Sequence, residues 1–503
     1  MFVRKKPNKS GIISVQVIDK SYGKYKVKRT IGSSADPKEV KHLMVQAKRW
    51  IETCKGEIAL DFDGRKLQAE YFLDKISEVV SCGVDLLLGK LFSEIGFDQI
   101  ESPLFKPLVL TRIENPASKL KTADYWFKYH NVAVDVSRIY RYLDKLHKNE
   151  QETIQRISFE HTQKILGGSI KMVFYDVTTI YFEAEQEDEL RKAGFSKDGK
   201  HQHPQIVLGL LVSAGGYPLA YDIFEGNKYE GETMLPVVDA FKEKYGFKQI
   251  TIVADAGLIN TKNIEELTKR AYPYILGARI KNEKNLIKEK ILALKLKDGQ
   301  CSTIKKDGKT TLIINYSNQR AKKDRFNRER GLKKLEKQLG SGKFTKASIN
   351  NRGYNKYLKL EGEINIEIDH DKFEQDAKWD GLKGYQTNTS LSPGEIIENY
   401  QHLWRIEKAF RISKHDLKIR PIFHRAERRI ESHVCLSFVA YKIYKELERQ
   451  LKEKQLGISP EKAIDIAKTI YKIKVNVNPA QTVEKIILLK NEQIKLAQAF
   501  GLI

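Results

Sequence analysis

Two short apolar runs that each end on an aspartate constrain the fold of this chain more than any other feature. The runs are Val173–Asp176 and Ile252–Asp255, and each has the length of a buried strand. They lie where apolar strands alternate with helical patterns, which predicts an α/β fold with a mixed sheet covered by helices. If the two strands are neighbours, their carboxylates lie within the spacing of about 4 Å that two metal ions need. The alternative is that each aspartate caps the turn after its strand.

A third carboxylate lies on a helix predicted over Pro393–Lys414. Six residues of this helix recur at steps of four and three and share one face: Ile396, Tyr400, Leu403, Glu407, Phe410 and Lys414. Because a stripe of Ile, Leu and Phe faces a core, we expect Glu407 at a core edge or in a cleft, where a carboxylate is paired or binds a cation. The alternative is a surface ion pair between Glu407 and Arg411.

Together the three carboxylates predict a metal site for phosphodiester chemistry. Asp176, Asp255 and Glu407 offer hard oxygen ligands, which suit Mg²⁺ or Mn²⁺, with two ions expected. Two such ions can promote in-line attack on a phosphodiester. Tyr400 and Lys414 lie one or two helical turns from Glu407, where they can hold phosphates on either side.

The charge balance predicts a polyanionic partner. The 503 residues include 89 Lys and Arg against 65 Asp and Glu, a formal net charge of +24, which favours nucleic acid over a generally basic soluble protein. The longest apolar runs, Ile206–Ala214 and Val434–Tyr441, are about half the length that crosses a bilayer. No apolar targeting segment follows Met1–Lys9, and the four cysteines lie far apart, so we expect a reducing cytoplasm.

Composition and periodicity divide the chain into six parts. They are a basic β-hairpin plus helix (1–60), a helical DNA-binding region (61–165), an α/β core (166–280), an insertion (281–384), the second part of the core (385–450) and a helical tail (451–503). Two helices predicted over 118–130 and 135–147 are compatible with a helix-turn-helix, or with two packed helices that have basic surfaces. A basic helix over 319–339 suits contact with phosphates, and a solvated surface helix explains it equally well.

The segment Tyr400-Gln-His-Leu-Trp-Arg-Ile-Glu407, with Lys414 seven residues later, resembles the Tyr–Arg–Glu–Lys signature of bacterial insertion-sequence DDE transposases. Further blocks match this family in order: Tyr175-Asp176-Val-Thr-Thr, Val253-Ala-Asp255-Ala-Gly, Asp380-Gly381 with Thr387-Asn388, and Arg420-Pro421 with His424. The likeness covers about residues 100–445. It implies an RNase H-like mixed sheet with helices on both faces, interrupted by a mostly β insertion before the last catalytic helix. An N-terminal β/helical DNA-binding region and a helical C-terminal tail complete the expected fold.

The resemblance also implies a function. It implies metal-dependent cleavage of double-stranded DNA at the terminal inverted repeats of an insertion sequence and strand transfer into target DNA, by a homodimer in the bacterial cytoplasm. Asp176, Asp255 and Glu407 would be the metal-binding triad, and Tyr400 and Lys414 would contact DNA. The rival functions are an RNase H-like endonuclease without strand transfer and a catalytically inactive DNA-binding relative.

One position departs from the family signature. Its arginine, three residues after the tyrosine, is Leu403 here. Arg405 is the candidate to take over this DNA contact, although it lies about 200° round the helix from Leu403.

Overall fold

The computed structural model describes residues 1–8, 10–54, 65–184, 186–196, 199, 202–247, 249–258, 260–341, 348–350, 353–361, 365–478 and 481–503. The chain forms two compact units. The smaller unit comprises Met1–Leu87, Lys128–Asn131 and Glu461–Ile503, and the larger unit comprises Leu88–Phe127 and Val132–Pro460. No helix within the described ranges combines the length and apolarity needed to span a bilayer.

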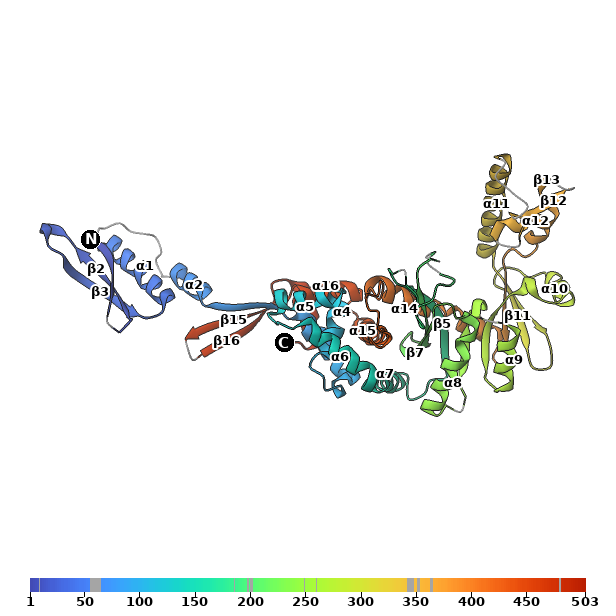
Figure 1. The fold of residues 1–503 in the computed structure, drawn as a ribbon, viewed down its shortest axis with the longest axis horizontal. Coiled ribbons are helices and arrows are strands. Elements are labelled where there is room, and N and C mark those ends of the chain that lie inside the picture. Colours follow the sequence, from blue (N-terminus) through green and yellow to red (C-terminus); the bar gives the residue numbers. More distant parts are fainter. Residues whose placement is uncertain are drawn as a thin grey trace. The chain divides into compact units, whose positions relative to one another are not determined.

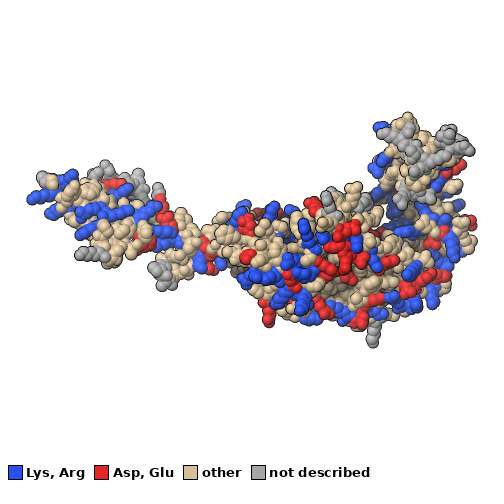
Figure 2. All heavy atoms as spheres, in the orientation of Figure 1, with Lys and Arg blue, Asp and Glu red and all other residues tan. Residues whose placement is uncertain are grey.

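The smaller unit begins with a three-stranded antiparallel sheet. Strands β1 (Phe2–Pro7), β2 (Ile13–Asp19) and β3 (Lys26–Ser34) pair in chain order, so the predicted hairpin has a third strand. Helix α1 (Pro37–Cys54) covers one face of the sheet, where Val15 and Val17 pack against it in one apolar core. Lys and Arg side chains gather along this sheet in Figure 2. The predicted boundary at residues 60 and 61 lies outside the described residues.

A second antiparallel sheet corrects the prediction of a helical tail over 451–503. Strand β15 (Tyr471–Asn478) pairs with β16 (Gln481–Ile487) on one side and with β4 (Ile76–Ser81) on the other (Figure 1). The segment Ile473–Val477 alternates apolar and polar residues, which is the period of a strand and not of a helix. The helices α2 (Arg65–Asp74), α16 (Pro460–Lys468) and α17 (Asn491–Phe500) complete this part of the chain. Because β4 lies within 61–165, that segment is not wholly helical either.

Between β4 and the central sheet the chain forms the helices α3 (Gly83–Ile95), α4 (Phe105–Glu114), α5 (Lys119–His130), α6 (Val136–Asn149) and α7 (Gln151–Ile165). The predicted helices over 118–130 and 135–147 match α5 and α6. The buried face of α6 packs on the 27-residue helix α15 (Glu427–Glu453), where the Ser432 hydroxyl donates to the Leu143 carbonyl at 2.6 Å. A helix-turn-helix role for α5 and α6 stays a prediction.

An eight-stranded mixed sheet forms the centre of the larger unit, which confirms the predicted mixed α/β fold. Its strand order is β10-β11-β14-β9-β8-β5-β6-β7. Strands β5, β8 and β9 are parallel, and the remaining pairs are antiparallel. The strands are β5 (Met172–Tyr181), β6 (Gln205–Ser213), β7 (Pro218–Glu225), β8 (Thr251–Ala254), β9 (Tyr274–Ala278), β10 (Cys301–Lys305), β11 (Thr311–Tyr316) and β14 (Leu382–Thr387).

The prediction that 281–384 is a mostly β insertion is wrong. Helices α10 (Asn285–Leu292), α11 (Asn318–Gly340) and α12 (His370–Ala377) dominate it, and β12 (Leu358–Glu361) and β13 (Asn365–Ile368) form only a short hairpin. Strands β10 and β11 extend the central sheet, because β11 pairs with β14 along its whole length. Helix α11, β12, β13 and α12 group together beyond the sheet (Figure 1) around a core that includes Leu335, Tyr357 and Phe373.

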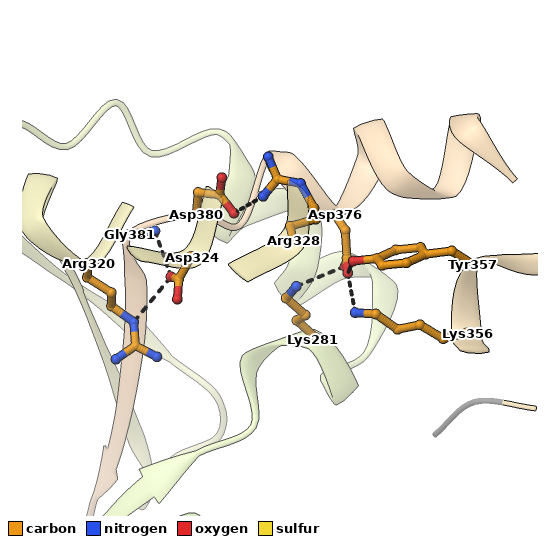
Figure 3. A network of polar contacts seen from close by, with 9 residues as sticks. All are labelled: Lys281, Arg320, Asp324, Arg328, Lys356, Tyr357, Asp376, Asp380 and Gly381. Carbon is orange, nitrogen blue, oxygen red and sulfur yellow. Dashed lines mark hydrogen bonds and ion pairs between the residues drawn. The ribbon is translucent and has the colours of Figure 1, made fainter. Parts of the chain in front are cut away.

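A network of ion pairs ties this group to the end of β9 (Figure 3). Asp376 of α12 accepts hydrogen bonds from Lys281 at 2.8 Å, from the Tyr357 hydroxyl at 2.7 Å and from Lys356. Burial acts to raise the pKa of Asp376, but these donors outweigh it and hold that pKa below its usual range. The Asp376 carboxylate is therefore stabilised in its ionised form.

Replacing Asp376 by Asn should destabilise the α12 segment by about 1–3 kcal/mol at pH 7, because charge-assisted hydrogen bonds are lost. Since folding lowers the pKa of Asp376, its contribution is present above the unfolded value near 3.9 and is lost as pH falls through the lower folded value. Hydrogen exchange of α12 at pH 7 and at pH 3 measures both effects. Asp371→Asn, an exposed position on the same helix, is the control; an equal loss in both variants would contradict this role of Asp376.

Candidate active site

Side-chain alternation places two carboxylates on one face of the central sheet. On β5, Val173, Tyr175 and Val177 point into the apolar core that α8 (Met234–Tyr245) covers, so Asp176 points to the opposite face. On β8, Ala254 points into the same core, and Asp255 follows it on the opposite face. Both carboxylates therefore lie on the face away from α8.

The parallel pairing of β5 with β8 brings these two residues to the same level. Tyr175 is the register partner of Ala254, so Asp176 and Asp255 come next on strands spaced about 4.8 Å apart. The prediction that Asp176 lies at a strand end is wrong. Asp176 lies inside β5, where it is the register partner of Leu210 on β6. Only its pairing with β8 ends at this point.

Neither aspartate acts as the turn cap considered above. The Asp176 Oδ1 atom accepts from the next backbone N–H, that of Val177, at 2.8 Å within the strand. The Asp255 Oδ1 atom accepts from the Tyr400 hydroxyl at 2.6 Å. Asp176 is half-buried and Asp255 is exposed, so both carboxylates lie at the edge of the packed core.

The helix predicted over Pro393–Lys414 is interrupted. Helix α13 (Pro393–Gln401) ends before Leu403, α14 (Trp404–Arg411) follows, and residues Ile412–Asp416 form a π-helix. At the junction the backbone N–H groups of Leu403 and Arg405 donate to carbonyls three residues back. These tighter turns rotate α14 relative to α13, so the predicted single face does not continue unchanged from Tyr400 to Lys414.

All three predicted carboxylates line one cavity of about 620 Å³ between the sheet and these helices. Its lining residues are Asp176, Asp255, Lys383, Tyr400, Gln401, Leu403, Trp404, Ile406 and Glu407. Glu407 is exposed, and its carboxylate makes no hydrogen bond or ion pair with a described residue, so the alternative pairing with Arg411 is not present there. Within the same described ranges, no three His, Cys, Asp or Glu side chains form a group that could hold a metal ion. The carboxylates share the cavity without forming a closed set of ligands.

Tyr400 holds Asp255 in place. Its hydroxyl lies so close to β9 that a Cβ atom at Gly277 would be 2.4 Å from it, so this position requires glycine. Its ring packs edge-on against Tyr385 of β14, with 4.9 Å between ring centroids. Burial and the Asp255 carboxylate raise the pKa of Tyr400 well above its usual value, so the hydroxyl stays protonated and donates to Asp255.

Sequence reasoning missed Lys383 of β14. It lies two positions before Tyr385 on the same face of the strand, and its Nζ atom lies 4.5 Å from the centre of the Tyr400 ring. Burial and Arg320 hold the pKa of Lys383 below its usual value, and Asp255 and Glu407 offset only part of this shift. The lysine is therefore the cation that faces the carboxylates, and period-two alternation along β14 is the signal that could have found it.

The other predicted DNA contacts lie outside this cavity. Leu403, at the signature's arginine position, is 7% exposed and lines the cavity. Arg405 does not line it, and burial lowers the pKa of Arg405, which Glu448 offsets only in part. Lys414 lies in the π-helix and is not among the lining residues. The structure brings Tyr400 together with the carboxylates, but not Arg405 or Lys414.

A second cavity of about 720 Å³ adjoins the first and shares Asp255, Tyr400 and Lys383 with it. It extends from β9 to α11 and α12, where the network of Figure 3 forms part of its wall. Arg320 and Lys281 are among its lining cations. The carboxylate cavity thus adjoins a charged surface of the inserted segment, where most of the cations pair with Asp324, Asp376 or Asp380.

No curated protein matches the chain in sequence. Among solved structures, a cryo-EM structure of a piggyBac transposase synaptic complex with hairpin DNA is similar to 79% of this chain and 78% of that one, with a TM-score of 0.40 and 10% identity. The model of the family described as "Transposase DDE domain" matches residues 168–443, which is more than half of the chain. The protein therefore belongs to the transposase DDE domain family.

Proposed function

We propose that this protein is the transposase of a bacterial insertion sequence, which cleaves double-stranded DNA at the terminal inverted repeats of its element and transfers the cut ends into target DNA. Membership of the family supports a transposase. The observation that supports this chemistry most is the equal level of Asp176 and Asp255 on neighbouring parallel strands, with Glu407 lining the same cavity. Two element ends must be held together for the reaction, so we propose a homodimer in the DNA complex.

The proposed catalytic core is RNase H-like. Strand order supports this proposal: β7, β6 and β5 form an antiparallel meander, and β8 and β9 follow β5 in parallel. The helices on both faces agree with it, since α8 covers one face and Tyr400 of α13 contacts Asp255 on the other. In this arrangement the carboxylates lie on the sheet face opposite α8 and line a cavity.

The side chains fit divalent metal ions by their chemistry. Asp176, Asp255 and Glu407 would hold Mg²⁺ or Mn²⁺, because all three offer hard oxygen ligands next to a cavity. When bound, two such ions supply Lewis-acid activation of the attacking oxygen and stabilisation of the leaving oxygen. Tyr400 orients Asp255 through its 2.6 Å hydrogen bond. Lys383 is placed to contact a phosphate that lies against the carboxylates.

Asp176→Asn, Asp255→Asn and Glu407→Gln should each reduce metal-dependent cleavage of the element ends more than about 100-fold and leave DNA binding within about threefold, because each removes one ligand charge from the cavity. Glu398→Gln, an exposed position on α13, is the matched control. Cleavage above a tenth of the wild-type rate in any of the three would exclude that residue from the triad. Joining of a pre-cleaved 3′-hydroxyl end to target DNA separates a transposase from a nuclease that only cuts.

Lys383→Met should slow cleavage at saturating Mg²⁺ by at least about tenfold, or roughly 1.4 kcal/mol of activation free energy, because the ammonium that faces the reacting phosphate is lost. Single-turnover cleavage of bound DNA measures this effect apart from binding. Lys359→Met removes one exposed charge from β12 and is the control. Equal rates in the two variants would show that Lys383 has no role beyond general charge.

A further inference from the structure

A third cavity, of about 550 Å³, lies away from the carboxylates between α4, the first turn of α5, the segment 418–424 and α15. Five of its lining residues are cationic: Arg112, Lys119, Lys121, Lys418 and Arg420. None of the described residues that line it is an aspartate or a glutamate. Leu120 and Phe423 line it and are 64% and 67% exposed, so the cavity can be reached from solvent.

Arg112 is buried here without a counter-anion among its hydrogen-bond partners. It is 5% exposed, and its guanidinium donates to the Lys418 carbonyl at 3.5 Å and to Nδ1 of His433 at 2.9 Å. Nε2 of His433 lies 2.9 Å from the Ile419 carbonyl, which can only accept. His433 therefore donates through Nε2, accepts through Nδ1 and is neutral. The charge of Arg112 is not neutralised by these two contacts.

Lys119 is the second buried cation in this cavity. It is 4% exposed, and its ammonium group has no hydrogen bond or ion pair with any residue in the described part of the chain. Burial and Arg112 lower the pKa of Lys119 well below its usual value. The Asp144 carboxylate favours the charged form of the neighbouring His424. This carboxylate already accepts hydrogen bonds from Arg428 and Arg429 at 2.8–2.9 Å. Two buried cations without an anion are costly, and an anion in the cavity would remove this cost.

The first turn of α5 adds to the positive potential of the cavity. Residues 116–121 line it, and the backbone N–H groups at a helix start have no partner within the helix. A helix N-terminus carries a partial positive charge and favours an anion, above all a phosphate. In this turn the Ser118 hydroxyl accepts from the Lys121 N–H at 3.4 Å. The helix end, Arg112 and Lys119 thus converge on one cavity from two helices.

We propose that this cavity is a binding site for a phosphate group, and that the phosphate belongs to the backbone of DNA bound by the protein. The assignment of this phosphate to DNA rests on the proposed function, whereas the proposal of a phosphate site does not. The segment 418–424 directly follows the π-helix after α14, so the site is formed by the residues that connect the Glu407 helix to α15. It would hold DNA at a point outside the carboxylate cavity, because the two cavities share no lining residue.

Lys119→Met tests the site in the full-length chain with two probes. The first is inorganic phosphate, at ionic strength matched with chloride, read as the shift in melting temperature. We expect phosphate to raise the melting temperature of the wild type by a few degrees and that of the variant by none, because the ligand binds only the folded wild-type site. Without phosphate the variant should melt no lower than the wild type, since a buried unpaired charge is removed. Lys119→Arg, which keeps the charge, should retain the response.

The second probe is duplex DNA with the ends of the element, read by fluorescence anisotropy. Lys119→Met should bind at least about tenfold more weakly than Lys148→Met, which removes one exposed charge from α6. Equal phosphate shifts in wild type and Lys119→Met would overturn the site. If Lys119→Met loses the phosphate-induced shift in melting temperature but binds DNA as tightly as Lys148→Met, the site binds free phosphate and not the phosphate of DNA. Failure of the wild type to bind DNA, with a phosphate shift that depends on Lys119, would refute the proposed function and support the phosphate site.

Discussion

The parallel pairing of β5 with β8 is the contact on which the candidate active site depends. It aligns Tyr175 with Ala254, and the residue that follows each of them in the chain is an aspartate. Because alternate side chains point to opposite faces, the same pairing directs both carboxylates away from the core that α8 covers. A shift of register by one residue would separate Asp176 from Asp255 and bury one of them among apolar side chains.

The elements around this pair fix the remaining groups. Strand β9 lies beside β8, and Gly277 gives the Tyr400 hydroxyl room to reach Asp255. Strand β14 lies beside β9 and presents Lys383 and Tyr385 to the same tyrosine. Helix α14 carries Glu407, which lines the same cavity. Each group comes from a different element, so the site exists only when the strands and helices are packed together.

The buried cations of the larger unit fall into two kinds. Lys442 is fully buried on α15, and its ammonium donates to the Ser158 carbonyl at 3.0 Å and to the Thr162 hydroxyl. Its hydrogen bonds are satisfied within the fold, so it is explained as a structural residue. Lys119 is nearly as buried but has no such partners among the described residues. This contrast separates a lysine that the fold uses for packing from one that we infer to bind a ligand.

Much of the fold and of the site could be predicted from local sequence, and the failures have a common cause. The apolar runs before Asp176 and Asp255 predicted two buried strands, since burial leaves a clear local pattern. The break at Leu403 was missed, because a helical stripe of apolar residues continues through a tight turn. Strand β15 was missed in a predicted helical tail, although its alternation was present, because its partner β4 lies almost 400 residues earlier.

The sequence by itself determined the side chains available and the elements that carry the candidate site: two strands with carboxylates, a helix with Glu407, and an excess of 24 positive charges. Only the tertiary structure decided which of them meet. It placed Asp176 beside Asp255, added Lys383, left Arg405 and Lys414 outside the cavity, and gathered Arg112 and Lys119 around another. The physical reason is that periodicity is a local property, whereas strand order and helix packing arise from hydrogen bonds and burial between segments far apart in the chain.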